Sequence, residues 1–236
     1  MIFGTIESFD EQGHAVALGH TGVEKAIALG FTEFDTAPVY GNQHEMSFPV
    51  LLGNPIRVIS KLPFNKFGYD NVIKEFEKET LPVTDYYIHW PFMNNQFQYE
   101  IKGTWEAFEY LHSKYNIKIG VCNFTENHLK RTFQTCTIPP AVNQIELNLK
   151  CQNNDLVKFC QKNNIEVQSY SSIRRGELSG LESIKWLLGL GVNPIVRSTK
   201  LSRLKRYLQA TPMVETNMEK YHTGERFCPD PYEIPS

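Results

Sequence analysis

Short apolar runs and longer amphipathic segments alternate along the whole chain. Most of the short runs are rich in Val and Ile and have the length of buried β-strands. The longer segments repeat apolar residues three or four positions apart, as Val72, Ile73 and Phe76 do, which is typical of helices that pack on one face. The pattern predicts strands that cover residues 2–6, 32–35, 56–61, 85–89, 117–121, 141–146, 165–170 and 194–196.

The predicted strands end at nearly regular intervals, close to residues 6, 35, 61, 89, 121, 146, 170 and 196. Strands that alternate with helices at such a period are typical of parallel βα units, because parallel strands need a crossover connection. Eight units close a (β/α)8 TIM barrel, an α/β fold within reach of 236 residues. The alternative is an open, doubly wound sheet. That fold usually has a glycine-rich turn after its first strand, and here the turn reads Glu7-Ser8-Phe9.

The same pattern defines the domain organisation. No linker or internal repeat interrupts the chain, so we expect a single domain over residues 1–236, in which residues 212–236 form a C-terminal tail over the barrel mouth. Two connecting segments carry weaker signals. Residues 7–20 are polar and contain glycine, which predicts a loop, and residues 43–52 predict a short helix.

Composition and charge argue against several classes of protein. The chain is 41% hydrophobic and 21% charged, and its net charge of −2 gives no hint of a nucleic-acid or membrane partner. No apolar run approaches the ~18 residues of a membrane span, and the N-terminus lacks a signal-peptide pattern. Five cysteines occur without a CxxC pair or metal-ligand spacing, so we expect reduced thiols, no metal and a cytoplasmic protein.

Polar or aromatic side chains stand at the ends of most of the predicted strands. In a TIM barrel these ends meet at one mouth, where the active site lies. Each residue alone has an ordinary explanation, such as packing for a histidine or solvation for a lysine, but the set together favours a functional site. Its members are Asp35, Tyr40, Lys61, His89, Asn123, Gln144, Tyr170, Arg197 and Ser198.

The motifs around these residues carry a family resemblance that extends from Ile2 to about the C-terminal tail. They are Asp35-Thr36-Ala37, Tyr40-Gly41-Asn42, Lys61, Ile88-His89-Trp90-Pro91, Gly120-Val121-Cys122-Asn123-Phe124, Val142-Asn143-Gln144-Ile145-Glu146 and Arg197-Ser198. Each motif is weak alone, but in this order and spacing the chain resembles the aldo-keto reductases. The resemblance implies a TIM barrel that reduces carbonyl compounds.

The resemblance also implies a catalytic tetrad of Asp35, Tyr40, Lys61 and His89. Hydride reduction of a carbonyl leaves an alkoxide that needs a proton, which Tyr40 would supply as general acid. A phenol with a pKa of ~10 is a sluggish acid at neutral pH, so we expect the ammonium of Lys61 to lower the pKa of Tyr40. Asp35 would hold Lys61 in place, and His89 would donate a hydrogen bond to the carbonyl oxygen.

The cofactor that the resemblance implies is NADPH (NADP). Asn123 and Gln144 would hold the nicotinamide carboxamide, and Tyr170 would stack on the ring. The residues assigned to this side of the cofactor are Cys122, which stands where the family usually has serine, Asn123, Gln144, Tyr170 and Ser171. A helix N-terminus with nearby guanidinium groups suits a phosphate. The residues assigned to the adenosine 2′-phosphate are Arg197, Ser198 and Arg203.

Two departures from the family bear on the substrate site. The N-terminal hairpin that closes the barrel bottom in the family is absent, and the connections after the fourth and seventh strands are short. We therefore expect a shallow, open pocket walled by Trp90, Phe92 and the tail around Phe227.

The sequence thus predicts NADPH-dependent reduction of an aldehyde or ketone to an alcohol. The expected partner is a small-molecule carbonyl substrate, and the expected state is a monomer, with an oligomer left open. The alternative function is that of a regulatory or binding subunit that kept the barrel and lost turnover. The complete tetrad argues against this alternative, and the short loops argue for it.

Overall fold

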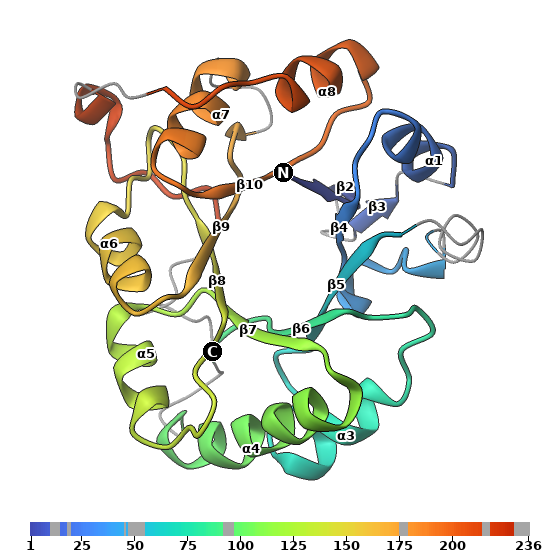
Figure 1. Ribbon diagram of the computed structural model, residues 1–236, viewed down its shortest axis with the longest axis vertical. Helices are drawn as coiled ribbons and strands as arrows, with labels where there is room; N and C mark the ends of the chain where they lie inside the picture. The colour runs from blue at the N-terminus through green and yellow to red at the C-terminus, as the bar shows by residue number, and fades with distance from the viewer. Residues whose placement is uncertain are drawn as a thin grey trace.

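The strands close into a parallel barrel, as predicted (Figure 1). The computed structural model of the protein describes residues 1–9, 15–17, 20–44, 46, 55–91, 97–174, 179–213 and 218–228. The barrel strands are β1 (Ile2–Gly4), β4 (Glu33–Asp35), β5 (Arg57–Leu62), β6 (Asp85–Ile88), β7 (Lys118–Cys122), β8 (Val142–Glu146), β9 (Glu166–Tyr170) and β10 (Asn193–Val196). β1 pairs with both β10 and β4, which closes the sheet and rules out the open alternative.

The helices form a ring outside the barrel and follow the strands in order (Figure 1). They are α1 (His20–Ala28), α3 (Tyr69–Phe76), α4 (Phe97–Tyr115), α5 (Glu126–Phe133), α6 (Asn154–Lys162), α7 (Gly180–Gly189) and α8 (Leu201–Leu208). Within the described part of the chain, the short 3-10 helices η1 (Pro38–Tyr40) and η3 (Met218–Tyr221) lie in connecting segments. Gly30 has a φ of +99° just after α1, so it ends that helix as the sequence predicts.

One prediction from the sequence is wrong. Residues 7–20 were expected to form a loop, but β2 (Ile6–Phe9) and β3 (Ala15–Ala17) pair as an antiparallel hairpin. The hairpin follows the carboxyl end of β1 and contacts η1, so it lies at the mouth of the barrel and not at its bottom. Its strands are short and carry no regular alternation of apolar and polar residues, which explains why the pattern missed them. The predicted short helix over 43–52 falls mostly outside the described residues.

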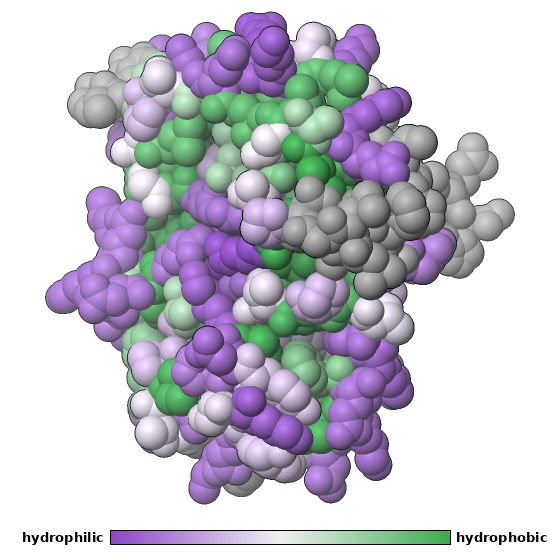
Figure 2. All heavy atoms as spheres, turned by 45° about the vertical axis from the view of Figure 1, so that its right-hand side comes forward, coloured by the Kyte–Doolittle hydropathy of each residue, from purple (hydrophilic) through white to green (hydrophobic). Residues whose placement is uncertain are grey.

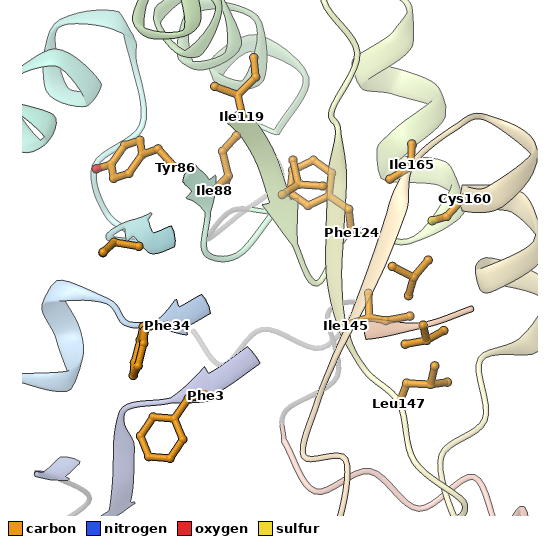
Figure 3. Packing of buried hydrophobic residues seen from close by; sticks show 14 of the residues in the cluster. Phe3, Phe34, Tyr86, Ile88, Ile119, Phe124, Ile145, Leu147, Cys160 and Ile165 are labelled. Atoms are coloured by element: carbon orange, nitrogen blue, oxygen red, sulfur yellow. The ribbon is translucent and has the colours of Figure 1, made fainter. Parts of the chain in front are cut away.

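The core has two layers, because successive residues of a strand point to opposite faces. Outside the strands, large side chains pack against the helices, among them Phe3, Phe34, Tyr86, Ile119 and Ile145 (Figure 3). Inside the barrel, Ile2, Ile59, Tyr87, Cys122 and Val142 form a smaller cluster. Hydrophilic side chains project around the outline of the molecule in Figure 2, with apolar surface between them. Among the described residues, no helix is both long and apolar enough to cross a membrane.

The inner cluster needs a glycine on β7. A Cβ atom at Gly120 would lie 2.8 Å from Cδ1 of Tyr87 and 3.0 Å from Cβ of Val142, which is closer than carbon atoms pack. The Tyr87 ring therefore lies against the bare backbone of β7. Gly103, on α4, is different, because a Cβ atom there would meet only the backbone nitrogen of Tyr69 at 3.8 Å.

These two glycines give a matched test of the packing. We expect Gly120→Ala to lower the free energy of unfolding by about 1–3 kcal/mol, because the added methyl group overpacks the barrel interior. Gly103→Ala should raise it by about 0.5–1 kcal/mol, because alanine favours a helix interior. Urea unfolding of both variants measures the difference, and equal stabilities would contradict the close contact at Gly120.

Candidate active site

The four residues of the predicted tetrad meet at the carboxyl ends of neighbouring strands. Asp35 ends β4, Lys61 lies near the end of β5, and His89 follows β6. Tyr40 ends η1, which follows β4. β5 pairs with both β4 and β6, so three of these side chains come from adjacent strands.

Lys61 lies at the centre of the group and is completely buried. Its Nζ donates hydrogen bonds to Asp35 Oδ1 at 2.7 Å, to the backbone oxygen of Thr36 at 2.9 Å and to the hydroxyl of Tyr40 at 3.4 Å. An ammonium has three hydrogens, and all three are used. Burial is the largest single effect and opposes the charge on Lys61, but the attraction and hydrogen bond of Asp35, together with smaller contributions from Tyr40 and Cys122, raise the pKa of Lys61, so the side chain stays charged.

The position of Tyr40 is fixed by the turn that carries it. Pro38 begins η1, and Gly41 ends it with a φ of +69°, a conformation that glycine adopts without strain. The amide of the buried Asn42 then donates to the backbone oxygen of Thr5 at 2.8 Å, which ties the turn to the segment after β1. As a result, the Tyr40 ring centroid lies 5.1 Å from Lys61 Nζ.

Two opposing effects act on the pKa of Tyr40. Burial of the phenol raises it, and Lys61 lowers it, as the sequence predicts. Burial is the larger effect, so the pKa of Tyr40 lies above the usual value of a tyrosine. Tyr40 therefore carries its proton throughout the neutral range.

His89 packs edge-on against Tyr40, with 5.8 Å between the ring centroids. Burial lowers the pKa of His89 well below its usual range, and the charge of Lys61 lowers it further. The imidazole is therefore neutral at pH 7 and has one N–H to donate. Its Nδ1 is buried and has no hydrogen-bond partner within the described part of the chain. The backbone oxygen of His89 accepts from Asn123 Nδ2 at 2.9 Å, which fixes the segment beneath the ring.

Asn123 and Tyr170, both assigned to the cofactor, bind each other. The Tyr170 hydroxyl donates to Asn123 Oδ1 at 2.6 Å. Asn123 has a φ of +63°, a left-handed conformation that asparagine tolerates better than most residues. Together with the bond to His89, this places Asn123 between the ends of β6 and β9.

Gln144 lies deeper than the sequence suggested and is only 3% exposed. Its Nε2 donates to Asp35 Oδ1 at 2.8 Å and to Gln168 Oε1 at 3.2 Å. Because a carboxylate can only accept, the atom that faces Asp35 must be the amide nitrogen. The structure thus joins a residue assigned to the cofactor directly to the Asp35–Lys61 pair.

Two further residues assigned to the nicotinamide lie in different surroundings. Cys122 faces the barrel interior among Ile59 and Tyr87, and burial raises the pKa of its thiol. Ser171 has a φ of +50°, and its Oγ lies 3.9 Å from Sγ of Cys228 in the C-terminal segment.

The residues assigned to the phosphate lie around the start of α8. Arg197 and Ser198 follow β10, and Ser198 Oγ accepts from the backbone N–H of Lys200 at 3.0 Å. Arg203 is exposed in the first turn of α8. No side chain caps this helix, so its first N–H groups retain their capacity to bind an anion.

Of the two residues assigned to the pocket wall, Trp90 is half-buried beside His89, and Phe92 falls outside the described residues. Among the residues that the structure describes, no three His, Cys, Asp or Glu side chains are grouped to hold a metal ion.

Sequence reasoning did not identify Glu146 as a residue that binds the C-terminal segment. Glu146 ends β8 and is completely buried. Its carboxylate accepts from the backbone N–H groups of Phe227 at 2.6 Å and Cys228 at 2.9 Å. Arg174 NH1 lies 3.9 Å from the same carboxylate, and its NH2 donates to Glu225 at 2.8 Å. A glutamate inside a buried strand is the signal that could have been followed, because a buried charge needs partners.

Comparisons with known proteins show which proteins this chain is similar to. The model of the Aldo/keto reductase family matches residues 1–185. The chain is 29% identical over 212 residues to the 9,11-endoperoxide prostaglandin H2 reductase of Trypanosoma cruzi, a match that covers 78% of this chain and 73% of that protein. It is 28% identical over 243 residues to the glyoxal reductase of Bacillus subtilis, covering 90% of this chain and 86% of that protein.

A solved structure extends the likeness to the whole fold. The crystal structure of a Gox0644 mutant in complex with NADPH has a TM-score of 0.82 and 26% sequence identity with this chain. The match covers 98% of this chain and 99% of that one. The family match spans well over half of the sequence, and the chain therefore belongs to the Aldo/keto reductase family and is an oxidoreductase.

Proposed function

We propose that the protein reduces an aldehyde or ketone to an alcohol with NADPH, and that Tyr40 is the general acid. The observation that carries the proposal is the hydrogen bonding of Lys61, whose buried Nζ joins Asp35 to the hydroxyl of Tyr40. A phenol beside a buried ammonium can release its proton, because the charge stabilises the phenolate. The neutral ring of His89, packed against Tyr40, is the second group within reach of a substrate oxygen.

Each residue has a separate task in this proposal. His89 donates a hydrogen bond to the carbonyl oxygen and orients it. Tyr40 passes its proton to the same oxygen as hydride reaches the carbon, and the phenolate later regains a proton from solvent. Lys61 stabilises the phenolate, and Asp35 keeps Lys61 charged and in place. Because the pKa of Tyr40 lies above its already high usual value, the phenol carries its proton at neutral pH and can donate it directly.

The chain also offers groups that fit NADPH, which supplies the hydride when bound. The exposed Arg203 and the uncapped start of α8 are suited to the 2′-phosphate, and Arg197 and Ser198 precede them. Asn123 and Tyr170 are held together at the ends of β7 and β9 and are proposed to contact the nicotinamide, with Cys122, Gln144 and Ser171 nearby. The Gox0644 mutant, which is similar in fold and sequence, binds NADPH in its crystal structure.

The substrate is proposed to be a small carbonyl compound that enters beside Trp90. The C-terminal segment is proposed to cover part of the barrel mouth, since Glu146 and Arg174 bind residues 225–228. Similar proteins that act on small carbonyl or peroxide compounds include the glyoxal reductase and the prostaglandin H2 reductase. The five thiols are all free, which suits the proposed cytoplasmic location.

The role of Tyr40 can be tested by Tyr40→Phe, which removes only the hydroxyl. We expect the rate of aldehyde reduction to fall by about 10²- to 10⁴-fold, the usual contribution of a general acid, with NADPH binding nearly unchanged. Tyr110→Phe, on the exposed face of α4, is the matched control and should retain full activity. If Tyr40→Phe keeps more than a few per cent of the wild-type kcat, Tyr40 is not the acid.

The buried ion pair can be tested through stability as well as activity. Lys61→Met leaves the carboxylate of Asp35 buried without its cation, so we expect the free energy of unfolding to drop by about 3–5 kcal/mol. It should also raise the pKa of Tyr40 further, because Lys61 lowers it, and activity should nearly vanish. The double variant Lys61→Met/Asp35→Asn should recover stability but not activity. Urea unfolding and NADPH consumption measure the two effects, and a double variant no more stable than the single one would contradict the pair.

Cofactor preference can be tested by removing the proposed phosphate contact. Arg203→Ala should weaken NADPH binding roughly 10- to 100-fold, the effect of losing a charge-assisted hydrogen bond, and barely change NADH binding. Lys205→Ala removes an exposed charge from the same helix and should leave both affinities unchanged. Fluorescence titration gives the dissociation constants. Equal affinity of the wild-type protein for NADPH and NADH would defeat the assignment.

A further inference from the structure

A line of polar side chains crosses the barrel interior, from the site at the mouth to the opposite end. We call Gln144, Gln168 and Tyr87 the polar column. All three are almost completely inaccessible, with 3%, 0% and 0% exposed. Barrel interiors of this kind are usually filled by Val, Ile and Leu. A buried amide also costs free energy unless its hydrogen bonds are made, so two amides in this position need an explanation.

The donors of both amides are fully used. Gln144 Nε2 donates to Asp35 Oδ1 at 2.8 Å and to Gln168 Oε1 at 3.2 Å. Gln168 Nε2 donates to Glu166 Oε1 at 3.0 Å and to the hydroxyl of Tyr87 at 3.2 Å. A side-chain amide has two hydrogens to donate, so neither glutamine has one to spare.

The direction of these hydrogen bonds is set by the carboxylates at the two ends. Glu166 can only accept, so the nitrogen of Gln168 must face it, and the oxygen of Gln168 then faces Gln144. The oxygen of Gln168 can only accept a hydrogen bond, so the nitrogen of Gln144 must face it. Asp35 also accepts from this nitrogen, so both neighbours of Gln144 call for the same orientation of its amide. A reversed amide at either position would bring two oxygens together. Gln168 therefore holds Gln144 in the one orientation that serves Asp35.

The far end of the column is anchored by an ion cluster at the amino ends of the strands. Arg57 donates to both oxygens of Asp85, at 2.8 and 2.5 Å, and to Glu33 at 3.2 Å. The hydroxyl of Tyr87 accepts from Arg57 at 3.2 Å and donates to Asp85 at 3.1 Å. These contacts hold the Tyr87 hydroxyl in place. This hydroxyl is the second acceptor of Gln168 Nε2, so the position of that hydrogen bond is set as well.

We propose that Gln168 is a positioning residue for the Asp35–Lys61 pair and acts through Gln144. The proposal rests on the proposed function, in which Lys61 stabilises the phenolate of Tyr40. Lys61 and Gln144 both donate a hydrogen bond to Oδ1 of Asp35. Displacement of Gln144 therefore removes one hydrogen bond from the carboxylate that holds the Lys61 ammonium. Gln168 contacts neither substrate nor cofactor in this scheme. Its effect is on proton transfer and not on aldehyde binding.

The test begins with Gln168→Met, which keeps the length of the side chain and removes the acceptor for Gln144. We expect kcat for aldehyde reduction to fall about 2- to 10-fold, the scale of one neutral hydrogen bond, with the KM for the aldehyde within about twofold of wild type. Thr104→Val is the matched control. It removes a hydrogen bond of the buried Thr104 on α4, whose Oγ1 accepts from the backbone N–H of Gly68 at 2.8 Å, and should leave kcat unchanged.

A spectroscopic measurement separates this proposal from the proposed function. The side-chain amide of Gln144 is assigned by NMR in the cofactor-free protein, with Gln144→Glu to identify the signal. In the wild type, its hydrogens should be protected from exchange with solvent. In Gln168→Met, one of them should move upfield, because it loses its oxygen acceptor.

The outcomes are distinct. If the Gln144 amide hydrogens of the wild type exchange rapidly with solvent, the proposed polar column is wrong. It is also wrong if Gln168→Met changes neither the NMR signal of the Gln144 amide nor kcat. If Thr104→Val lowers kcat as much as Gln168→Met does, Gln168 affects kcat only through the general stability of the protein, and the positioning role is wrong. Absence of NADPH-dependent reduction in the wild type would instead defeat the proposed function, while the amide measurements would still test the column.

Discussion

The site depends on a lysine ammonium that is kept charged without water. A fully buried cation is costly, and Lys61 is tolerated because a carboxylate, a backbone oxygen and a phenol take up all three of its hydrogens. The same contacts place Tyr40 beside the charge. Stability and chemistry are thus coupled here, since a change that loosens the ion pair also moves the proposed acid.

The barrel interior supports this pair with layers of different character. The layer at the mouth is polar, with Asp35, Lys61 and Gln144. The middle layer combines the apolar Ile2, Ile59 and Val142 with Tyr87 and Gln168, and the layer at the amino ends is ionic around Arg57. In the structure, the Arg57 cluster occupies the amino ends of β4, β5, β6 and β9.

The sequence was a good guide to the strands, because most of them contain short apolar runs that end at a nearly regular spacing along the chain. It also indicated which residues stand at the strand ends, and the structure brings Asp35, Tyr40, Lys61 and His89 together there. It was a poor guide to contacts between polar residues far apart in the chain. Gln144 bonds to Asp35 across 109 positions, and Glu146 bonds to Phe227 across 81. No local pattern encodes such pairings, and a glutamine within a strand looks the same whether it faces a cofactor or a carboxylate.

The seam of the barrel has a consequence for how the site comes into existence during folding. β1 pairs with β4 and with β10, so Ile2 lies beside Ile195 at nearly the other end of the chain. Thr5, just after β1, donates from its backbone and its hydroxyl to the backbone oxygen of Asp35, and accepts from Asn42 in the turn of Tyr40. Contacts between distant segments form slowly, because a long loop must close first. The turn that carries the proposed acid is therefore tied to the segment that follows β1, and β1 pairs on its other side with β10 near the far end of the chain, so that loss of the β1–β10 seam would loosen the strand next to which that turn is anchored.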